Sequence, residues 1–163
     1  MRRKLLWMLV LGAVILGAGE YVGSIHATSA SGFTGTTLAV GRFEDIEVSN
    51  HVFLQEGLLT KGPSELYVQS NVWTPGGTTG WHTHPGHSLI TVTAGAVTAY
   101  DAHDPSCTPH VYTAGMGFVD PGGDHVHVLR NEGSVEARTI AVQLIPAGAT
   151  RRIDAGGSSS CPF

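Results

Sequence analysis

The stretch GGTTGWHTHPGHSLITVTAG, residues 76–95, holds three of the nine histidines of the chain within six positions. Alternate residues of a β-strand point to the same face, so His82 and His84 share a face if this stretch is extended. A second pair with the same spacing, His125 and His127, follows in DHVHVLRN. One such pair alone is better explained as a polar strand face. Two pairs favour a metal site, because inward-facing residues of different strands converge inside a β-barrel.

The sequence after residue 31 consists of short runs rich in Val, Thr, Ile, Leu and Tyr, separated by Gly and Pro. It has no helical period of useful length, so it predicts an all-β sandwich or barrel. The segment VTAGAVTA predicts a tight hairpin at Gly95, because glycine supplies the positive φ of a two-residue turn. The expected strands are 37–46, 51–57, 64–74, 81–85, 88–93, 96–101, 110–113, 117–120, 125–130 and 135–145.

The first thirty residues have the three-part plan of a secretory signal. Three cations precede an apolar run from Leu5 to about Gly19, and small residues follow. The run is shorter than the roughly 20 residues that span a bilayer, which favours export to the cell envelope or medium. An uncleaved membrane anchor is the alternative. We therefore divide the chain into a signal peptide or N-terminal membrane anchor (1–30), a β-barrel domain (31–152) and a Gly/Ser-rich tail (153–163).

The charge of the chain limits its partners. Cleavage after Ala30 would remove three cations and one acid and change the formal charge from −4 to −6. The remaining Lys and Arg residues are scattered and form no basic stripe, which argues against nucleic acid as a partner. We expect a small-molecule ligand. The sequence leaves the oligomeric state open: a homodimer would protect the exposed strand edges, but no residue requires it. Contact with a membrane is expected only through the N-terminal segment, if that segment is not cleaved.

Cys107 and Cys161 are the two cysteines of the chain. An exported protein meets an oxidising compartment, so a disulfide between them is expected, and it would fasten the tail to the domain. The alternative is two free thiols.

Both histidine stretches resemble the motifs of the cupin superfamily. The first motif is glycine, five residues, His-x-His, a short gap, glutamate, six residues and glycine. The second is glycine, five residues, Pro-x-Gly, two residues, histidine, three residues and asparagine. The resemblance implies a double-stranded β-helix, or jelly-roll barrel, with a metal ion inside. The matching positions are Gly76, His82, His84 and Gly95 for the first motif, and Gly115, Pro121, Gly123, His127 and Asn131 for the second.

The histidine ligands of the family carry over to His82, His84 and His127, but its glutamate does not. Ser88 stands in the glutamate position. Three neutral imidazoles would leave a divalent ion its full charge. Such a site favours anionic ligands, and it favours Fe, Mn, Ni, Cu or Zn over Mg or Ca. The candidates for an additional ligand are His87, Ser88 and His125.

The resemblance leaves more than one function open. Three-histidine sites occur in cupin dioxygenases, which implies a metal-dependent oxygenase acting on a small anionic molecule, and the superfamily also contains isomerases. The alternatives are a non-catalytic small-molecule binding module and a structural barrel, which the missing glutamate favours somewhat. His125 is the candidate catalytic acid or base, because the pKa of histidine lies near neutrality. Asp120 and Asp124, which flank the Pro-Gly-Gly turn, are candidates to accept a hydrogen bond from a ligating imidazole.

Overall fold

The computed structural model describes residues 28–50, 56–161 and 163. The predicted signal or anchor segment, 1–30, therefore lies almost entirely outside the described residues. The described part is all-β, as predicted, and none of its residues forms a helix that could cross a membrane. The strands are β1 (Ser31–Phe43), β2 (Glu47–Asn50), β3 (Glu56–Leu59), β4 (Ser64–Thr78), β5 (His82–Thr83), β6 (Ser88–Ala94), β7 (Ala96–Asp101), β8 (His110–Thr113), β9 (Gly117–Asp120), β10 (His127–Arg130), β11 (Ala137–Pro146) and β12 (Ile153–Asp154).

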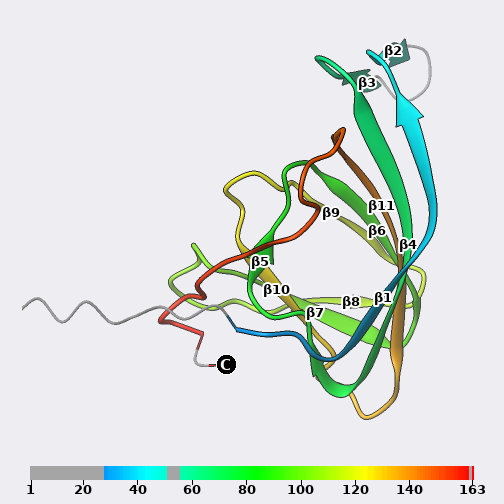
Figure 1. Cartoon of the computed structure of the whole chain (residues 1–163). Helices are drawn as coiled ribbons and strands as arrows, with labels where there is room; N and C mark the ends of the chain where they lie inside the picture. Colours follow the sequence, from blue (N-terminus) through cyan, green and yellow to red (C-terminus); the bar gives the residue numbers. More distant parts are fainter. Residues whose placement is uncertain (1–27, 51–55, 162) are drawn as a thin grey trace, which may run out of the picture.

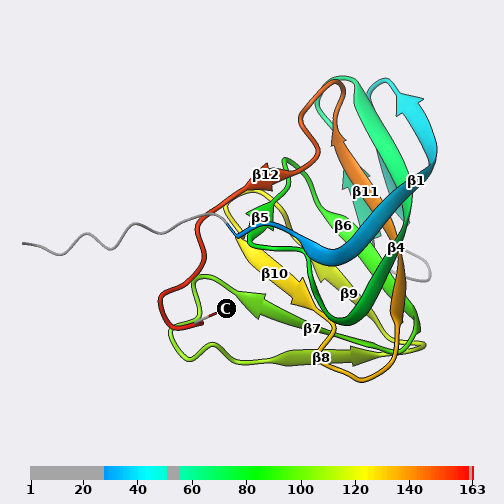
Figure 2. The same cartoon turned by 60° about the horizontal axis from the view of Figure 1, so that its bottom comes forward.

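Two antiparallel sheets face each other and form a nearly closed barrel (Figure 1). One sheet has the strand order β1-β4-β11-β6-β9, and the other has the order β12-β5-β10-β7-β8 (Figure 2). They join where Arg130 of β10 pairs with Thr78 of β4. Strands β2 and β3 form a separate two-stranded ribbon. This arrangement confirms the predicted jelly-roll barrel.

The predicted hairpin at Gly95 is wrong. Gly95 does separate β6 from β7 and has a positive φ of 65°. However, β6 pairs with β11 and β9, whereas β7 pairs with β10 and β8. Gly95 is therefore a corner at which the chain passes from one sheet to the other. A local pattern of strand, glycine and strand does not distinguish such a corner from a hairpin, because only the pairing partners differ.

The hydrophobic core occupies the barrel interior. Trp73 of β4 is fully buried and contacts the ring of Phe33, with 4.9 Å between the ring centroids. Strand β10 contributes Leu129 to this cluster. The other buried members are Ile90, Val92, Val97, Ala137 and Ala141. Burial of large side chains at about 25 cal/mol per Å² supplies the main stabilising free energy of such a domain.

A second apolar cluster lies under the C-terminal tail. It contains Trp81, Tyr100, Val128 and Cys161. Val128 belongs to it because alternate residues of β10 face opposite sides of the sheet, with Leu129 in the core. The disulfide expected between the two cysteines is present, with 5.4 Å between the Cα atoms.

The tail also extends the second sheet as β12, whose residues Ile153 and Asp154 pair with Thr83 and His82. The aromatic ring of Phe163, close to the end of the chain, stacks on Trp81. The tail thus crosses β5, the strand that carries His82.

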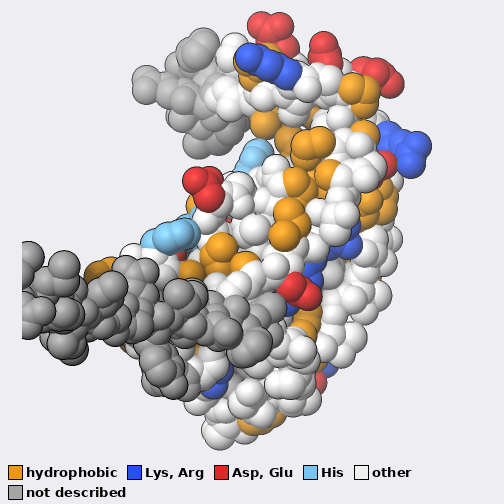
Figure 3. Space-filling model, turned by 60° about the vertical axis from the view of Figure 1, so that its left-hand side comes forward, with side chains coloured by type: hydrophobic (Ala, Val, Ile, Leu, Met, Phe, Trp, Pro, Cys, Tyr) orange, Lys and Arg blue, Asp and Glu red, His pale blue; other side chains and the backbone are white. Residues whose placement is uncertain are grey.

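The outer surface carries apolar and charged side chains together. Leu89 of β6 and Val119 of β9 are paired across the two strands and are 55% and 59% exposed. On the face drawn in Figure 3, apolar side chains are interspersed with charged side chains of both signs. The homodimer stays a prediction.

Candidate metal centre

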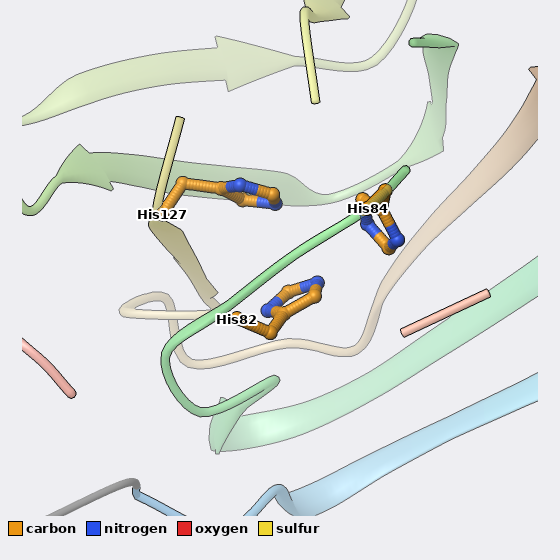
Figure 4. A group of neighbouring side chains, drawn as sticks. All are labelled: His82, His84 and His127. Carbon is orange, nitrogen blue, oxygen red and sulfur yellow. The ribbon is translucent and has the colours of Figure 1, made fainter. Parts of the chain in front are cut away.

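His82 and His127 meet because their strands are neighbours in register. His82 of β5 pairs directly with His127 of β10, so both side chains leave the sheet on the same face. His84 directly follows the end of β5, on the same segment of chain as His82 (Figure 4). The ligand nitrogens of the three histidines lie within 4.8 Å of one another, and the rings point to a common region (Figure 4). The structure thus brings these three predicted residues together.

Backbone carbonyl groups hold the three imidazole rings. Nδ1 of His82 donates to the carbonyl oxygen of Gly80 at 2.9 Å, and Nδ1 of His84 donates to that of Arg151 at 2.6 Å. Nδ1 of His127 contacts the carbonyl oxygen of His125 at the longer distance of 3.4 Å. A carbonyl oxygen can only accept, so Nδ1 carries the hydrogen in each ring and Nε2 presents a lone pair. This tautomer is the one that a metal ion requires at Nε2.

Burial keeps these imidazoles neutral. The burial of His82 lowers its pKa to about 2, with further lowering by the neighbouring His127. Burial lowers the pKa of His127 to about 4, although Asp120 opposes the shift. The pKa of His84 is also lowered, mainly by burial. Because a protonated imidazole cannot ligate, this lowering of the pKa prepares all three rings for a metal ion at neutral pH.

Asp120, at the end of β9, lies beside the three histidines. Its carboxylate is 3% exposed, and Oδ2 lies 3.3 Å from Nε2 of His84 and 3.4 Å from Nε2 of His127. Oδ1 accepts a hydrogen bond of 3.0 Å from the backbone N–H of Gly122, which fixes the orientation of the carboxylate. Asp120 also forms a second group of potential ligands with His125 and His127.

One cavity, which we call the main cavity because it is lined by all three histidines, has a volume of about 210 Å³. Its apolar wall includes Phe33, Trp73 and Ile90, and its polar wall includes Gln69 and Gln143. Every histidine and every carboxylate that lines it belongs to the group of His82, His84, His127 and Asp120. The cavity therefore offers a small molecule room next to the potential metal ligands.

Arg151 also lines the main cavity, and the sequence did not single it out. Its guanidinium donates to three neutral side chains at distances of 2.5 to 3.1 Å, those of Gln143, Thr37 and Gln69. It also lies over the ring of Tyr67, 4.4 Å from the ring centroid. Among the described residues no carboxylate pairs with Arg151, whereas Arg152 pairs with Asp154. Arg151 thus brings an uncompensated positive charge to the cavity. No motif contains it, so no sequence signal could have found it.

The other predicted site residues lie at different places. Ser88, in the glutamate position, is buried and lines the main cavity. His87 lines a separate cavity beside Pro63 and Leu144, and its ring is not part of either group of potential metal ligands. It faces away because β6 begins at Ser88 and alternate residues face opposite sides.

His125 precedes β10 and does not line the main cavity. It lines a second cavity, which also contains the stacked rings of Tyr112 and Phe118. Nε2 of His125 lies 3.3 Å from Oδ2 of Asp101, and its Nδ1 lies 3.6 Å from Oδ1 of Asp120. Both ring nitrogens therefore face carboxylates. An acid–base role for His125 would be exercised in the second cavity.

Comparison with known proteins agrees with the fold and with the motifs. The family described as Cupin domain matches residues 72–143, which include both histidine stretches. Residues 72–143 of the chain belong to the cupin superfamily. No curated protein sequence matches it.

Two solved structures show the same fold at low sequence identity. The polyketide cyclase RemF from Streptomyces resistomycificus is 14% identical with a TM-score of 0.54, and the match covers 83% of this cupin and 80% of that chain. Peruvianin-I, a cysteine peptidase from Thevetia peruviana latex, is 23% identical with a TM-score of 0.50, and the match covers 77% and 68%. At these identities the likeness concerns the fold alone.

Proposed function

We propose that this cupin binds a divalent transition-metal ion through His82, His84 and His127, and binds a small anionic molecule at that ion. One observation carries the proposal: the ligand nitrogens of two buried histidines and of the partly buried His84 lie within 4.8 Å of one another, while each Nδ1 faces a backbone carbonyl group. An all-imidazole set suits Fe, Mn, Ni, Cu or Zn. When bound, such an ion acts as a Lewis acid, and a redox-active ion such as iron activates dioxygen.

The cavity favours an anion as the ligand. The metal ion and Arg151 both bring positive charge, and the positive charge of Arg151 has no carboxylate partner among the described residues. The guanidinium can bind a carboxylate through two parallel hydrogen bonds. Its hydrogen bonds to Gln69 and Gln143 hold it in place before a ligand arrives. A small carboxylate that reaches both the ion and Arg151 is therefore the expected ligand class.

Among enzymatic reactions, oxygenation fits this cavity better than isomerisation. An isomerase moves a proton and needs a positioned acid or base that is free to act. In the main cavity, each histidine belongs to the group of potential ligands, and the lining carboxylate, Asp120, lies 3.3 and 3.4 Å from two of these histidines. We therefore propose a metal-dependent oxygenase of a small anion. The same lack of a free base also favours the second candidate, a binding module without turnover.

Metal analysis tests the first part of the proposal. The full chain is purified without a histidine tag, and its metal content is measured by elemental mass spectrometry. We expect about one ion per chain in the wild type and in His87→Ala, whose ring lies in a different cavity. We expect loss of the ion in His82→Ala. Wild-type protein that holds no ion, and takes up none of the five added metals, would refute the proposal.

Anion binding and oxygen uptake test the second part. Malonate is titrated into Co²⁺-loaded protein, and its dissociation constant should rise about 10- to 100-fold in Arg151→Gln, because hydrogen bonds between charged groups are lost. Arg138→Gln, which removes an exposed arginine paired with Glu136, is the control. Oxygen uptake by Fe²⁺-loaded protein in the presence of a small carboxylate would support an oxygenase. Binding of metal and anion without uptake, across a panel of carboxylates, would favour the binding module.

We also propose export of this cupin. The disulfide between Cys107 and Cys161 supports an oxidising compartment, since such bonds are rare in the cytosol. N-terminal sequencing of the chain recovered from an export-competent host tests the proposal. A mature protein that begins near residue 31 is expected, and a cytosolic protein with an intact N-terminus would contradict it.

A further inference from the structure

Asp120 and Ser88 occupy opposite positions of two paired strands. Ser88, which stands where the cupin motif has its glutamate, begins β6, and Asp120 ends β9. The two residues are direct partners in the antiparallel register. Side chains of such partners leave the sheet on the same face, with Cβ atoms about 5 Å apart. A carboxylate at position 120 therefore reaches the part of the cavity that a side chain at position 88 would enter.

The buried Oδ2 atom of Asp120 lacks a hydrogen-bond donor. The groups nearest to it in the site are Nε2 of His84 and Nε2 of His127, at 3.3 and 3.4 Å. With hydrogen on Nδ1, both Nε2 atoms present lone pairs, so three electron-rich atoms face one another in a buried place. An unpaired buried carboxylate is costly, and a cation between the three atoms removes that cost.

The distances from Asp120 to His84 and His127 fit a shared cation, and His82 is grouped with the same two histidines. A tetrahedral ion with bonds of about 2.1 Å to nitrogen and oxygen holds its ligand atoms about 3.4 Å apart. The two separations between Oδ2 and the Nε2 atoms, 3.3 and 3.4 Å, agree with that spacing. The hydrogen bond from Gly122 to Oδ1 leaves Oδ2 as the oxygen directed at the histidines.

We propose that Asp120 replaces the missing glutamate as the carboxylate ligand of the ion, supplied from β9 in place of β6; this rests on the metal site proposed above. The donor set is then three imidazoles and one carboxylate. The ion and its ligands together carry one positive charge, one less than the set of three imidazoles would carry. With Arg151 nearby, the cavity still attracts an anion.

Metal affinity of Asp120→Asn tests the assignment, with Asp124→Asn as the matched control. The introduced amide keeps the size of the side chain and an Oδ1 acceptor for Gly122. Asp124 flanks the same turn, but it is exposed, belongs to neither group of potential ligands, and among the described residues does not form the predicted contact with a ligating imidazole. We expect the affinity for Zn²⁺, measured by chelator competition, to fall about 100-fold or more in Asp120→Asn, since loss of a ligand should exceed the 10- to 100-fold cost of losing an outer partner. Asp124→Asn should bind like the wild type.

Two further measurements separate a ligand from a structural residue. Without metal, Asp120→Asn should have a urea midpoint equal to or above that of the wild type, because it no longer buries an unpaired charge. The double variant Ser88→Glu/Asp120→Ser returns the carboxylate to β6 and should recover at least about tenfold of the lost affinity. Co²⁺ absorption spectra should likewise change in Asp120→Asn and return toward the wild type in the double variant.

The possible failures are distinguishable. If the wild type binds Zn²⁺, His82→Ala does not, and Asp120→Asn binds like the wild type, the role of Asp120 is refuted and the histidine site stands. If metal-free Asp120→Asn is less stable than the wild type and its folded fraction binds Zn²⁺ normally, the carboxylate is structural and the proposal is wrong. If the wild type binds no metal, both proposals fail.

Discussion

Removal of the disulfide should destabilise this cupin by about 4 kcal/mol. The bond joins Cys107 and Cys161, which are 54 residues apart in the sequence, and closing a loop of that length removes chain entropy from the unfolded state by about that amount. The double variant Cys107→Ser/Cys161→Ser releases the closure and leaves the side-chain volumes nearly unchanged. Cys161 is 3% exposed and packs against Trp81 and Val128, so any packing change adds to the loss.

Urea unfolding of the metal-free protein measures this loss. With a slope of about 2 kcal/mol per M, the midpoint should fall by about 2 M. Reduced wild-type protein is the internal control, because it should match the double-serine variant. A loss below about 1 kcal/mol, with the slope unchanged, would refute the loop-closure argument and mean that the contacts of the tail already restrict the unfolded chain.

The same perturbation should weaken metal binding. The tail pairs β12 with β5 through Asp154 and His82, and the carbonyl oxygen of Arg151 orients the ring of His84. Loosening the tail relaxes both constraints, and loss of such outer partners costs about 10- to 100-fold in metal affinity. Chelator competition on the oxidised and reduced wild type gives the comparison. Equal affinities would mean that β12 holds the two histidines without help from the disulfide.

Two further predictions concern the site. Burial lowers the pKa of His82 to about 2 and that of His127 to about 4, so below pH 6.5 these histidines bind protons in the unfolded chain but not in the metal-free folded state. The free energy of unfolding should therefore be constant above pH 6.5 and fall below it by about 1.4 kcal/mol per pH unit for each of the two histidines. Urea unfolding measured between pH 7 and pH 5 should show a weaker dependence of this free energy on pH in His82→Asn than in the wild type. Gly122→Ala should lower the free energy of unfolding by about 3 kcal/mol and weaken metal binding, because Gly122 has a φ of 68° and a methyl group there would collide with the carbonyl oxygen of Gly86. Gly148→Ala is the control, since Gly148 has a φ of 75° but lies in open space, and it should lower the free energy of unfolding by only about 1 kcal/mol. Equal losses of stability in thermal unfolding would contradict the steric reason.

The sequence predicted the fold class and the three histidines for different reasons. The motifs depend on spacing along the chain, and spacing is a local property that a sequence shows directly. His84 and His125 lie outside the strands, contrary to the prediction, since β5 ends at Thr83 and β10 begins at His127. His82 and His127 meet because of a register between β5 and β10, which no count along one strand provides.

Features that depend on pairing between distant segments could not be predicted. The pattern around Gly95 is the same for a hairpin and for a corner between sheets. Gly95 forms a corner because β6 pairs with β9 and β11, whereas β7 pairs with β8 and β10. Arg151 enters the cavity because the chain leaves β11 and returns across β5 as β12. Neither position carries a signal of its own, because a single arginine or glycine is compatible with many environments.

The carboxylate of the site shows why a missing motif residue is weak support for a missing function. Counting along the first motif places a serine at position 88, and the deduction that the ion keeps its full charge follows only if no other acid enters the same space. In an antiparallel sheet, position 88 has a spatial equivalent at position 120, and there an aspartate directs its unpaired oxygen at two of the three histidines. Selection for a ligand acts on where the atom arrives and not on which strand carries it. If Asp120 binds the ion as proposed, the charge of the site has to be counted across β6 and β9 together, and the absent glutamate no longer indicates a missing ligand.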